Sequence, residues 1–232
     1  VLVKVMSDSI CMSTYKLVAQ GKKHKRAPQN IDTNPVIVGH ECSGIIVEVG
    51  EKWKNQFRPG QKFSLQPALN YQGKLDSPGY SYEFCGGACT YCIMPHEVME
   101  LGCLLDYTGE SFFEASLGEP MSCIIGGYHA NYHTNKKNYG HAMGTKEDGN
   151  ILIMGGCGPM GLGAVSYGLQ FENKPRRIVV TDISDDRIQR AREVISEESA
   201  KKRGIELRYV NTAAMEDPIA ELMAITEGHG YD

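Results

Sequence analysis

Long apolar runs are missing from this sequence, and none approaches the ~20 residues that a membrane-spanning helix needs. The N-terminus also lacks the charged-then-apolar layout of a secretory signal, so we expect a cytoplasmic protein that binds no membrane. An excess of positive charge is missing as well, because 24 Lys and Arg residues stand against 28 Asp and Glu residues. The resulting net charge of −4 argues against a nucleic-acid binder, which is normally basic.

Internal repeats and low-complexity segments are also absent, and 41% hydrophobic residues with 22% charged residues is an ordinary globular composition. The eight cysteines lie mostly in apolar runs of a chain too large to need disulfide staples, so we expect reduced thiols. The chain opens inside a strand-like run and ends with Gly230-Tyr231-Asp232, which is typical of the start of another strand. We therefore expect it to be part of a longer polypeptide.

The chain divides into two regions with different sequence patterns. Up to about residue 115, short apolar runs such as 36–38, 45–49 and 88–95 alternate with turn residues, which predicts a small β-barrel or sandwich. Beyond residue 150, apolar strands alternate with amphipathic helices, and this predicts an α/β domain with a parallel sheet. The polar stretch 131–150 is expected to connect the two.

A glycine cluster opens the second region. Gly156-Cys157-Gly158-Pro159-Met160-Gly161 fits G-x-G-x-x-G between the strand expected at 151–154 and an amphipathic helix. Such glycines allow a tight turn, close approach to a pyrophosphate and packing of helix on strand. Asp182 ends the next strand 21 residues after Gly161, near the ~20 expected for an acid that binds the adenosine ribose. This carboxylate would repel a 2′-phosphate, so we expect NAD(H) to be favoured over NADP(H).

Three dispersed residues could together bind a catalytic zinc, which takes three protein ligands and keeps a fourth position open. Cys11 follows a strand, His40 lies in a glycine-spaced run, and Glu119 precedes Pro120. Taken singly, each has a simpler interpretation as a buried thiol, a loop histidine or a helix N-terminal acid.

With these residues in view, the chain resembles the zinc-dependent medium-chain alcohol and polyol dehydrogenase superfamily. The resemblance lies in Cys11-x-Ser13, Gly39-His40-Glu41-x-x-Gly44, Glu119-Pro120 and the glycine cluster. It implies a β-rich GroES-like barrel domain at residues 1–119, which holds zinc, and a doubly wound Rossmann domain at residues 120–232, which holds the dinucleotide. Both domains are expected to be incomplete in this chain.

The resemblance also implies a role for each matching residue. Cys11, His40 and Glu119 would ligate zinc, with Glu41 as the alternative carboxylate. Ser13 matches the hydroxyl that begins a proton relay from the substrate alcohol. The cofactor would be bound by Gly156, Gly158, Pro159, Met160, Gly161 and Asp182, with Arg187 near enough in sequence to contact a phosphate.

Two features depart from the superfamily pattern. Thr14 stands where many relatives carry an acid three residues after the ligand cysteine, so a carboxylate that orients the ligands is missing or comes from elsewhere. Cys85, Cys89 and Cys92 lack the four-cysteine spacing of a structural zinc lobe, and we expect no structural zinc.

The substrate is less closely defined. Segments 9–16, 79–82, 113–120 and 128–134 resemble the L-sorbose-1-phosphate reductase branch, which implies reduction of a ketose phosphate to a polyol phosphate. The basic run 22–26 could attract a phosphorylated substrate or could simply be a solvated loop, and Lys16 is a further candidate near Cys11. A non-phosphorylated polyol, a zinc-independent quinone-reductase-like reaction and a non-catalytic NAD-binding redox sensor are the alternatives. We expect a small-molecule substrate and a homo-oligomer.

Overall fold

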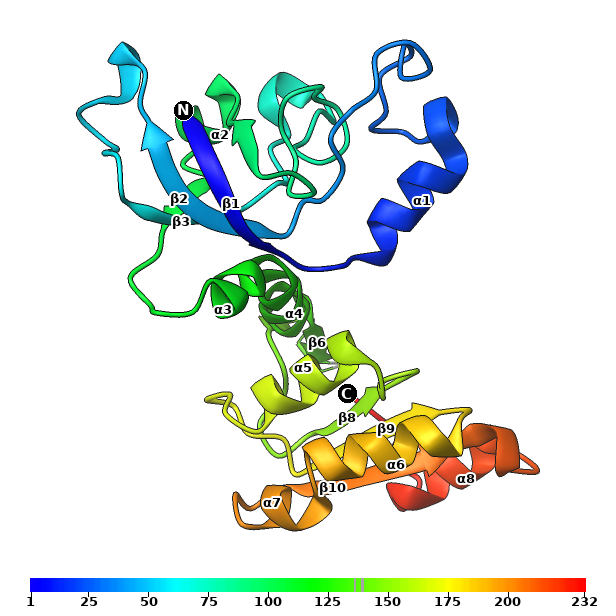
Figure 1. The fold of residues 1–232 in the computed structure, drawn as a ribbon. Coiled ribbons are helices and arrows are strands. Elements are labelled where there is room, and N and C mark those ends of the chain that lie inside the picture. The colour runs from blue at the N-terminus through cyan, green and yellow to red at the C-terminus, as the bar shows by residue number, and fades with distance from the viewer. Residues whose placement is uncertain (136, 139) are drawn as a thin grey trace. The chain divides into compact units, whose positions relative to one another are not determined.

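The computed structural model describes residues 1–135, 137–138 and 140–232. These residues form two compact units, Val1–Pro120 and Met121–Asp232, which run from blue to green and from green to red in Figure 1. In the described part of the chain, no helix is both long enough and apolar enough to cross a bilayer. The units are described separately below.

The N-terminal unit is built on a five-stranded antiparallel sheet with the order β4-β1-β2-β3-β5. The strands are β1 (Leu2–Asp8), β2 (Cys42–Glu48), β3 (Lys62–Leu65), β4 (Tyr91–Ile93) and β5 (Leu104–Asp106). Val3, Ile46, Phe63 and Leu65 are almost fully buried in its core. The short strands and frequent turns expected from the sequence are therefore confirmed.

Helices and turns connect these strands. They are α1 (Met12–Gln20), η1 (Gly21–Lys23), η2 (Glu51–Trp53), η3 (Tyr71–Gly73), α2 (His96–Glu100) and α3 (Phe112–Ser116). Leu17 is the buried residue of α1, and it packs with Ala27 and Tyr80 in a small second cluster. The loop after α1 is thereby fixed beside Tyr80.

One expected strand does not form. Residues 36–38 carry strand-like apolar side chains, but they pair with loop segments. The Ile37 amide donates to Tyr82 O at 3.3 Å, and the Ala88 amide donates to Val38 O at 2.8 Å. The run expected as a strand over 88–95 is likewise regular only at β4.

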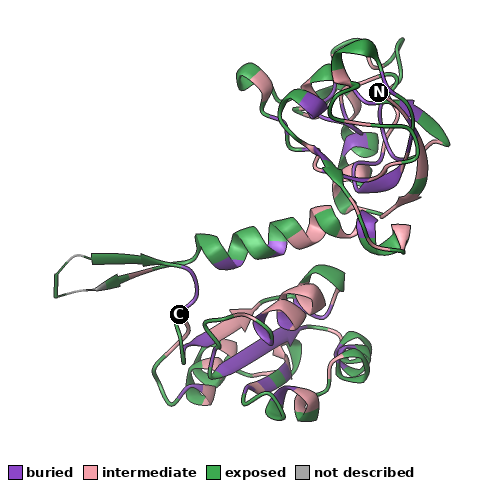
Figure 2. Ribbon diagram, turned by 90° about the vertical axis from the view of Figure 1, so that its left-hand side faces the viewer, coloured by how far each residue is buried: buried purple, intermediate pink, exposed green. Residues whose placement is uncertain are grey.

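The C-terminal unit contains a three-stranded parallel sheet with the order β10-β9-β8. Its strands are β8 (Asn150–Ile153), β9 (Arg177–Asp182) and β10 (Glu206–Asn211). The helices are α4 (Gly118–Ala130), which begins before the unit boundary, and α5 (Pro159–Gly168), α6 (Asp185–Val194), α7 (Glu197–Lys201) and α8 (Pro218–Ile225), with the short turn η4 (Thr212–Ala214). All six residues of β9 are buried, as Figure 2 shows in purple.

The alternation of strand and helix after residue 150 is confirmed, and a side chain caps the N-terminus of both α6 and α8. Ser184 Oγ accepts from the Arg187 amide, and Asp217 accepts from the Ile219 and Ala220 amides. The stretch expected to be only a connection instead contains a hairpin, β6 (Tyr132–Asn135) paired antiparallel with β7 (Gly140–Met143).

Candidate active site

A thiol, an imidazole and a carboxylate meet in the N-terminal unit. Donor atoms of Cys11, His40 and Glu41 all lie within 4.8 Å of one another. His40 and Glu41 are buried, and Cys11 is partly buried. Sulfur, nitrogen and oxygen donors in one place are the ligand types of a catalytic zinc, so the donor set fits this metal.

The pairing of β1 with β2 brings these residues together. Asp8, the last residue of β1, lies opposite Cys42, the first residue of β2. Cys11 follows β1 by three residues, and His40 and Glu41 directly precede β2. Gly39 allows the approach, because its φ is +91° and a Cβ there would collide with the Asp8 carboxylate.

Neighbouring polar groups orient His40 on both sides of its ring. Thr14 Oγ1 lies 3.4 Å from His40 Nδ1, and the Tyr80 hydroxyl lies 3.1 Å from His40 Nε2. A threonine hydroxyl three residues after Cys11 thus contacts the His40 ring.

Glu41 is fixed through both its backbone and its carboxylate. Its amide donates to Asp8 Oδ1 at 3.1 Å, and its carbonyl accepts from the Ser9 amide at 3.1 Å. The Ser9 hydroxyl also donates to the Glu41 carboxylate, whose other oxygen lies 3.9 Å from His40 Nε2. These contacts hold the carboxylate beside the imidazole.

Burial dominates the electrostatics of the cluster. Burial lowers the pKa of His40, although the negative charge of Glu41 opposes this change. A lowered pKa favours the neutral imidazole, which can donate a lone pair to a metal. Burial also raises the pKa of Asp8 to about 6, although a hydrogen bond from the Glu41 amide opposes the change. It raises the pKa of Tyr80 to about 12 despite a hydrogen bond with Ser13.

The two remaining predicted residues of this unit lie around the cluster. Ser13 is in the first turn of α1, where its amide donates to Cys11 Sγ at 3.4 Å. Glu119 is in the first turn of α4, and among the described residues it is not one of the donors grouped with Cys11 and His40. Its charge contributes to the raised pKa of Tyr80. The structure therefore brings Cys11 and His40 together with Glu41.

Tyr80 and Asp8 were not selected from the sequence. Tyr80 is 6% exposed and touches His40 across 40 positions of chain, so no local pattern indicates the contact. Asp8 could have been noticed as an acid at the end of the strand that leads to Cys11.

Cys85, Cys89 and Cys92, the three cysteines considered for a structural zinc, lie in or against the hydrophobic core of the N-terminal unit. Cys85 and Cys92 are buried in the core of the sheet, and Cys85 Sγ contacts Met94 Sδ at 3.7 Å. Cys89 Sγ donates to Gly86 O at 3.1 Å.

In the C-terminal unit, the glycine cluster forms the turn from β8 into α5. The Gly156 amide donates to Thr181 O at 2.8 Å, and Gly158 is the N-cap of α5, followed by Pro159. A Cβ on Gly161 would collide with the backbone of Gly156, whereas one on Gly158 would meet nothing within 4 Å. Gly158 therefore leaves open space at the helix N-terminus, and the exposed Met160 follows Pro159.

Asp182, the last residue of β9, is buried at the carboxyl end of the parallel strands, where the glycine turn also lies. Asp182 Oδ1 accepts from the Ile183 amide at 2.8 Å and from the Ser184 amide at 3.2 Å. Arg187 lies in the first turn of α6, three residues beyond Ser184. Asp182 thus orders the turn between β9 and α6 with one of its two oxygens.

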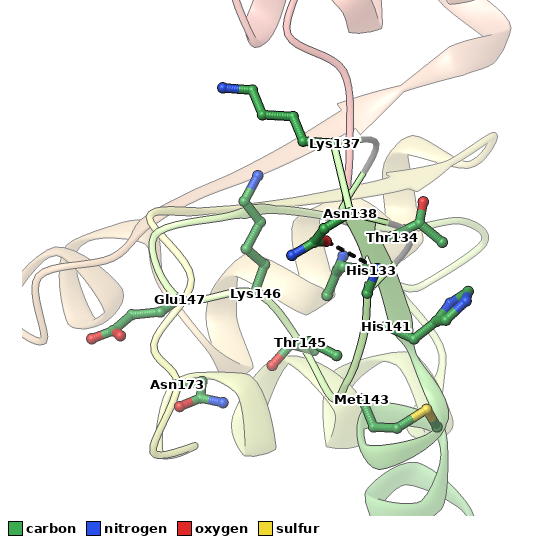
Figure 3. Close-up of a pocket in the computed structure, with 12 residues that line it drawn as sticks. His133, Thr134, Lys137, Asn138, His141, Met143, Thr145, Lys146, Glu147 and Asn173 are labelled. Atoms are coloured by element: carbon green, nitrogen blue, oxygen red, sulfur yellow. Dashed lines mark hydrogen bonds between the residues drawn. The ribbon is translucent and has the colours of Figure 1, made fainter.

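A wide, shallow depression of about 860 Å³ lies beside the β6–β7 hairpin. Figure 3 shows its lining, which includes His133, His141 and Lys146. None of the residues predicted to bind the metal or the cofactor is among those that line this depression, so we assign it no part in the expected reaction.

The chain is similar to known dehydrogenases in sequence and in fold. Residues 1–105 match the alcohol dehydrogenase GroES-like domain. The chain is 53% identical over 231 residues to mannitol-1-phosphate 5-dehydrogenase of Aliivibrio fischeri and 40% identical over 232 residues to L-sorbose 1-phosphate reductase of Klebsiella pneumoniae. Both alignments include the whole chain, which spans 54% and 55% of the lengths of these relatives.

The fold has close counterparts among solved structures. The crystal structure of 2R,3R-butanediol dehydrogenase from Bacillus subtilis superposes with a TM-score of 0.69 at 23% identity, over 97% of this chain and 60% of that one. Its GroES-like and Rossmann architecture is the α/β fold expected from the sequence. These matches support a relationship with the medium-chain polyol dehydrogenase superfamily.

Proposed function

We propose that the protein carrying this chain catalyses reversible hydride transfer between a nicotinamide cofactor and a ketose phosphate or polyol phosphate. The observation that carries the proposal is the buried donor set of Cys11, His40 and Glu41. The relatives named for mannitol 1-phosphate and L-sorbose 1-phosphate support a phosphorylated substrate. Of these, L-sorbose 1-phosphate is the substrate we propose first.

Cys11, His40 and Glu41 would hold one zinc ion, and Glu119 is the alternative carboxylate. When bound, zinc supplies a Lewis acid that polarises the substrate oxygen. Thr14 fixes the imidazole, while Asp8 and Ser9 fix Glu41, so the donors keep their orientation without help from the metal.

Ser13 is the proposed proton carrier. It lies two residues from Cys11 and forms a hydrogen bond with Tyr80, whose hydroxyl contacts His40. A hydroxyl held in this way can give a proton to the alkoxide oxygen during reduction and accept one during oxidation.

The turn at Gly156, Gly158 and Gly161, with Pro159 and Met160, would hold the pyrophosphate, and Asp182 the ribose of the adenosine. When bound, the nicotinamide donates or accepts the hydride. We propose NAD(H) as the preferred form because of the Asp182 charge, with Arg187 as the group that would assist NADP(H).

The test is kcat/KM of the full-length protein with NADH and L-sorbose 1-phosphate beside L-sorbose, and with NAD and D-mannitol 1-phosphate beside mannitol and sorbitol. We expect the phosphate to improve kcat/KM by at least tenfold, which corresponds to ~1.4 kcal/mol of transition-state binding. A smaller improvement would leave a general polyol dehydrogenase. Tight binding of NAD(H) without turnover of any of these compounds would favour a redox sensor.

A further inference from the structure

The basic run at residues 22–26 does not fold as a uniform solvated loop. Lys22, Lys23 and Lys25 are exposed, and Lys22 pairs with Asp32 at 3.2 Å. His24 and Arg26 are partly buried instead. The run therefore separates into three solvated lysines and two side chains that face the protein.

Both inward-facing side chains lie against the ring of Tyr80. The imidazole of His24 stacks on it with centroids 5.5 Å apart and planes 9° apart. The guanidinium carbon of Arg26 lies 5.6 Å from the ring centroid, a cation–π distance. The same ring is tilted against His40 at 4.7 Å. The ring of one buried tyrosine thus contacts both of these side chains and a candidate zinc ligand.

Arg26 is held in a defined position. Its Nη1 donates to Leu75 O at 3.0 Å, its amide donates to His24 Nδ1 at 3.3 Å, and its carbonyl accepts from Ser81 Oγ at 2.7 Å. A guanidinium has five N–H donors, so the bond to Leu75 leaves donors for an anion. Pre-ordering of this kind reduces the entropy that binding would cost.

The charge of Arg26 reaches the groups around it. Burial is the main reason that the pKa of His24 is lowered, and the charges of Arg26 and Lys25 lower it further. Arg26 thus places a positive charge beside the Tyr80 ring, which favours an anion at this position.

We infer that Arg26 and His24 form the subsite for the substrate phosphate, and that Tyr80, which contacts both of them and His40, adjoins this subsite and the candidate metal site. The inference rests on the proposed function and names the residues that would distinguish a sugar phosphate from the free sugar. An arginine fork gives a phosphate two charge-assisted hydrogen bonds, and His24 adds a further N–H.

The test compares Arg26→Gln and Arg26→Lys with Lys23→Gln, which removes an equal charge from an exposed position of the same run. Titration calorimetry of the metal-free full-length protein with D-mannitol 1-phosphate and with mannitol measures the contribution of the phosphate without catalysis. We expect Arg26→Gln to weaken binding of the phosphate ester at least tenfold, Arg26→Lys to weaken it less, and Lys23→Gln to leave it within about twofold. Binding of mannitol should be the same in all forms.

Steady-state kinetics and thermal melting complete the test. The Arg26→Gln variant should raise KM for the phosphorylated substrate, retain kcat/KM for the free polyol and melt cooperatively. His24→Gln should have a smaller effect in the same direction. Phosphate-ester affinity unchanged in Arg26→Gln would overturn the inference, while turnover in the wild type would still support the proposed function. Arg26-dependent binding without turnover in the wild type would keep the subsite and reject the proposed function.

Discussion

His40 and Glu41 are adjacent in the chain directly before β2, and their donor atoms lie within 4.8 Å of each other and of Cys11 Sγ. The Tyr80 hydroxyl and the Glu41 carboxylate both face His40 Nε2, and Cys11 supplies the third donor type. The carboxylate beside the imidazole is therefore Glu41, which the sequence offered only as the alternative to Glu119. Geometry favours Glu41 as the first carboxylate for a metal.

This geometry predicts a difference between two isosteric variants. Glu41→Gln should weaken zinc binding by about 100-fold or more, because it removes a donor from the group of three. Glu119→Gln should weaken it by about tenfold or less. Competition with a chromogenic chelator measures both affinities, with Cys103→Ala as a control for a thiol outside the donor set. Equal losses in the two glutamine variants would contradict the assignment of Glu41.

Asp182 combines two effects that one substitution can separate. Its Oδ1 caps the Ile183 and Ser184 amides, while its negative charge would repel a 2′-phosphate. Asp182→Asn keeps an acceptor for the turn and removes the charge. We expect the ratio of kcat/KM for NAD to that for NADP to fall at least tenfold, with melting nearly unchanged. Asp182→Ala should lose the cap as well and be less stable by about 1 kcal/mol. A higher kcat/KM for NADP in the wild type would refute the assigned role.

At the scale of elements, the turn from β8 to α5 contains two glycines with opposite surroundings. Gly161→Ala would drive a methyl group into the backbone of Gly156 and should destabilise the C-terminal unit by about 2 kcal/mol. Gly158→Ala meets open space, so it should change the unfolding free energy by less than about 0.5 kcal/mol and instead weaken NAD binding. Denaturant unfolding and NAD titration of both variants check this pair. A stable Gly161→Ala protein would contradict the packing role.

The elements of the C-terminal unit could be predicted because their signals are local. Apolar periodicity, the Ser184 cap and the Asp217-Pro218 pair each lie within one element. The hairpin β6–β7 was missed because its residues are polar and largely exposed, so the strands carry no alternating apolar pattern. Residues 36–38 were wrongly expected to form a strand because their partners are loop residues far along the chain.

For the candidate metal site, the sequence predicted the donor residues but not the groups that contact them. Cys11 and His40 stand in recognisable motifs, but the choice between Glu41 and Glu119 depends on which carboxylate the folded chain brings to both of them. The contacts of Tyr80 with His24, Arg26 and His40 join residues that lie 40 or more positions apart in the chain. Such long-range contacts leave no spacing to detect in a single sequence.

At the scale of the whole molecule, the candidate metal donors and the candidate cofactor-binding residues belong to two units, each with its own hydrophobic core. The metal donors belong to the unit Val1–Pro120, which is built around the five-stranded sheet. The glycine turn and Asp182 belong to the unit Met121–Asp232, which has its own core around Val165 and Ile178. Changes in one unit should therefore leave ligand binding by the other unit intact, whereas changes in either unit should impair the proposed hydride transfer.

Zinc content and turnover of Cys11→Ala, measured together in the full-length protein, test the central claim most directly. The wild type should contain one zinc ion per catalytic site and oxidise NADH with a ketose phosphate. The Cys11→Ala variant should lose the metal and at least 1000-fold in kcat/KM, a loss of ~4 kcal/mol of transition-state stabilisation, while it still binds NADH. A Cys11→Ala protein that contains no metal yet turns over at the wild-type rate would contradict zinc-dependent catalysis at this site.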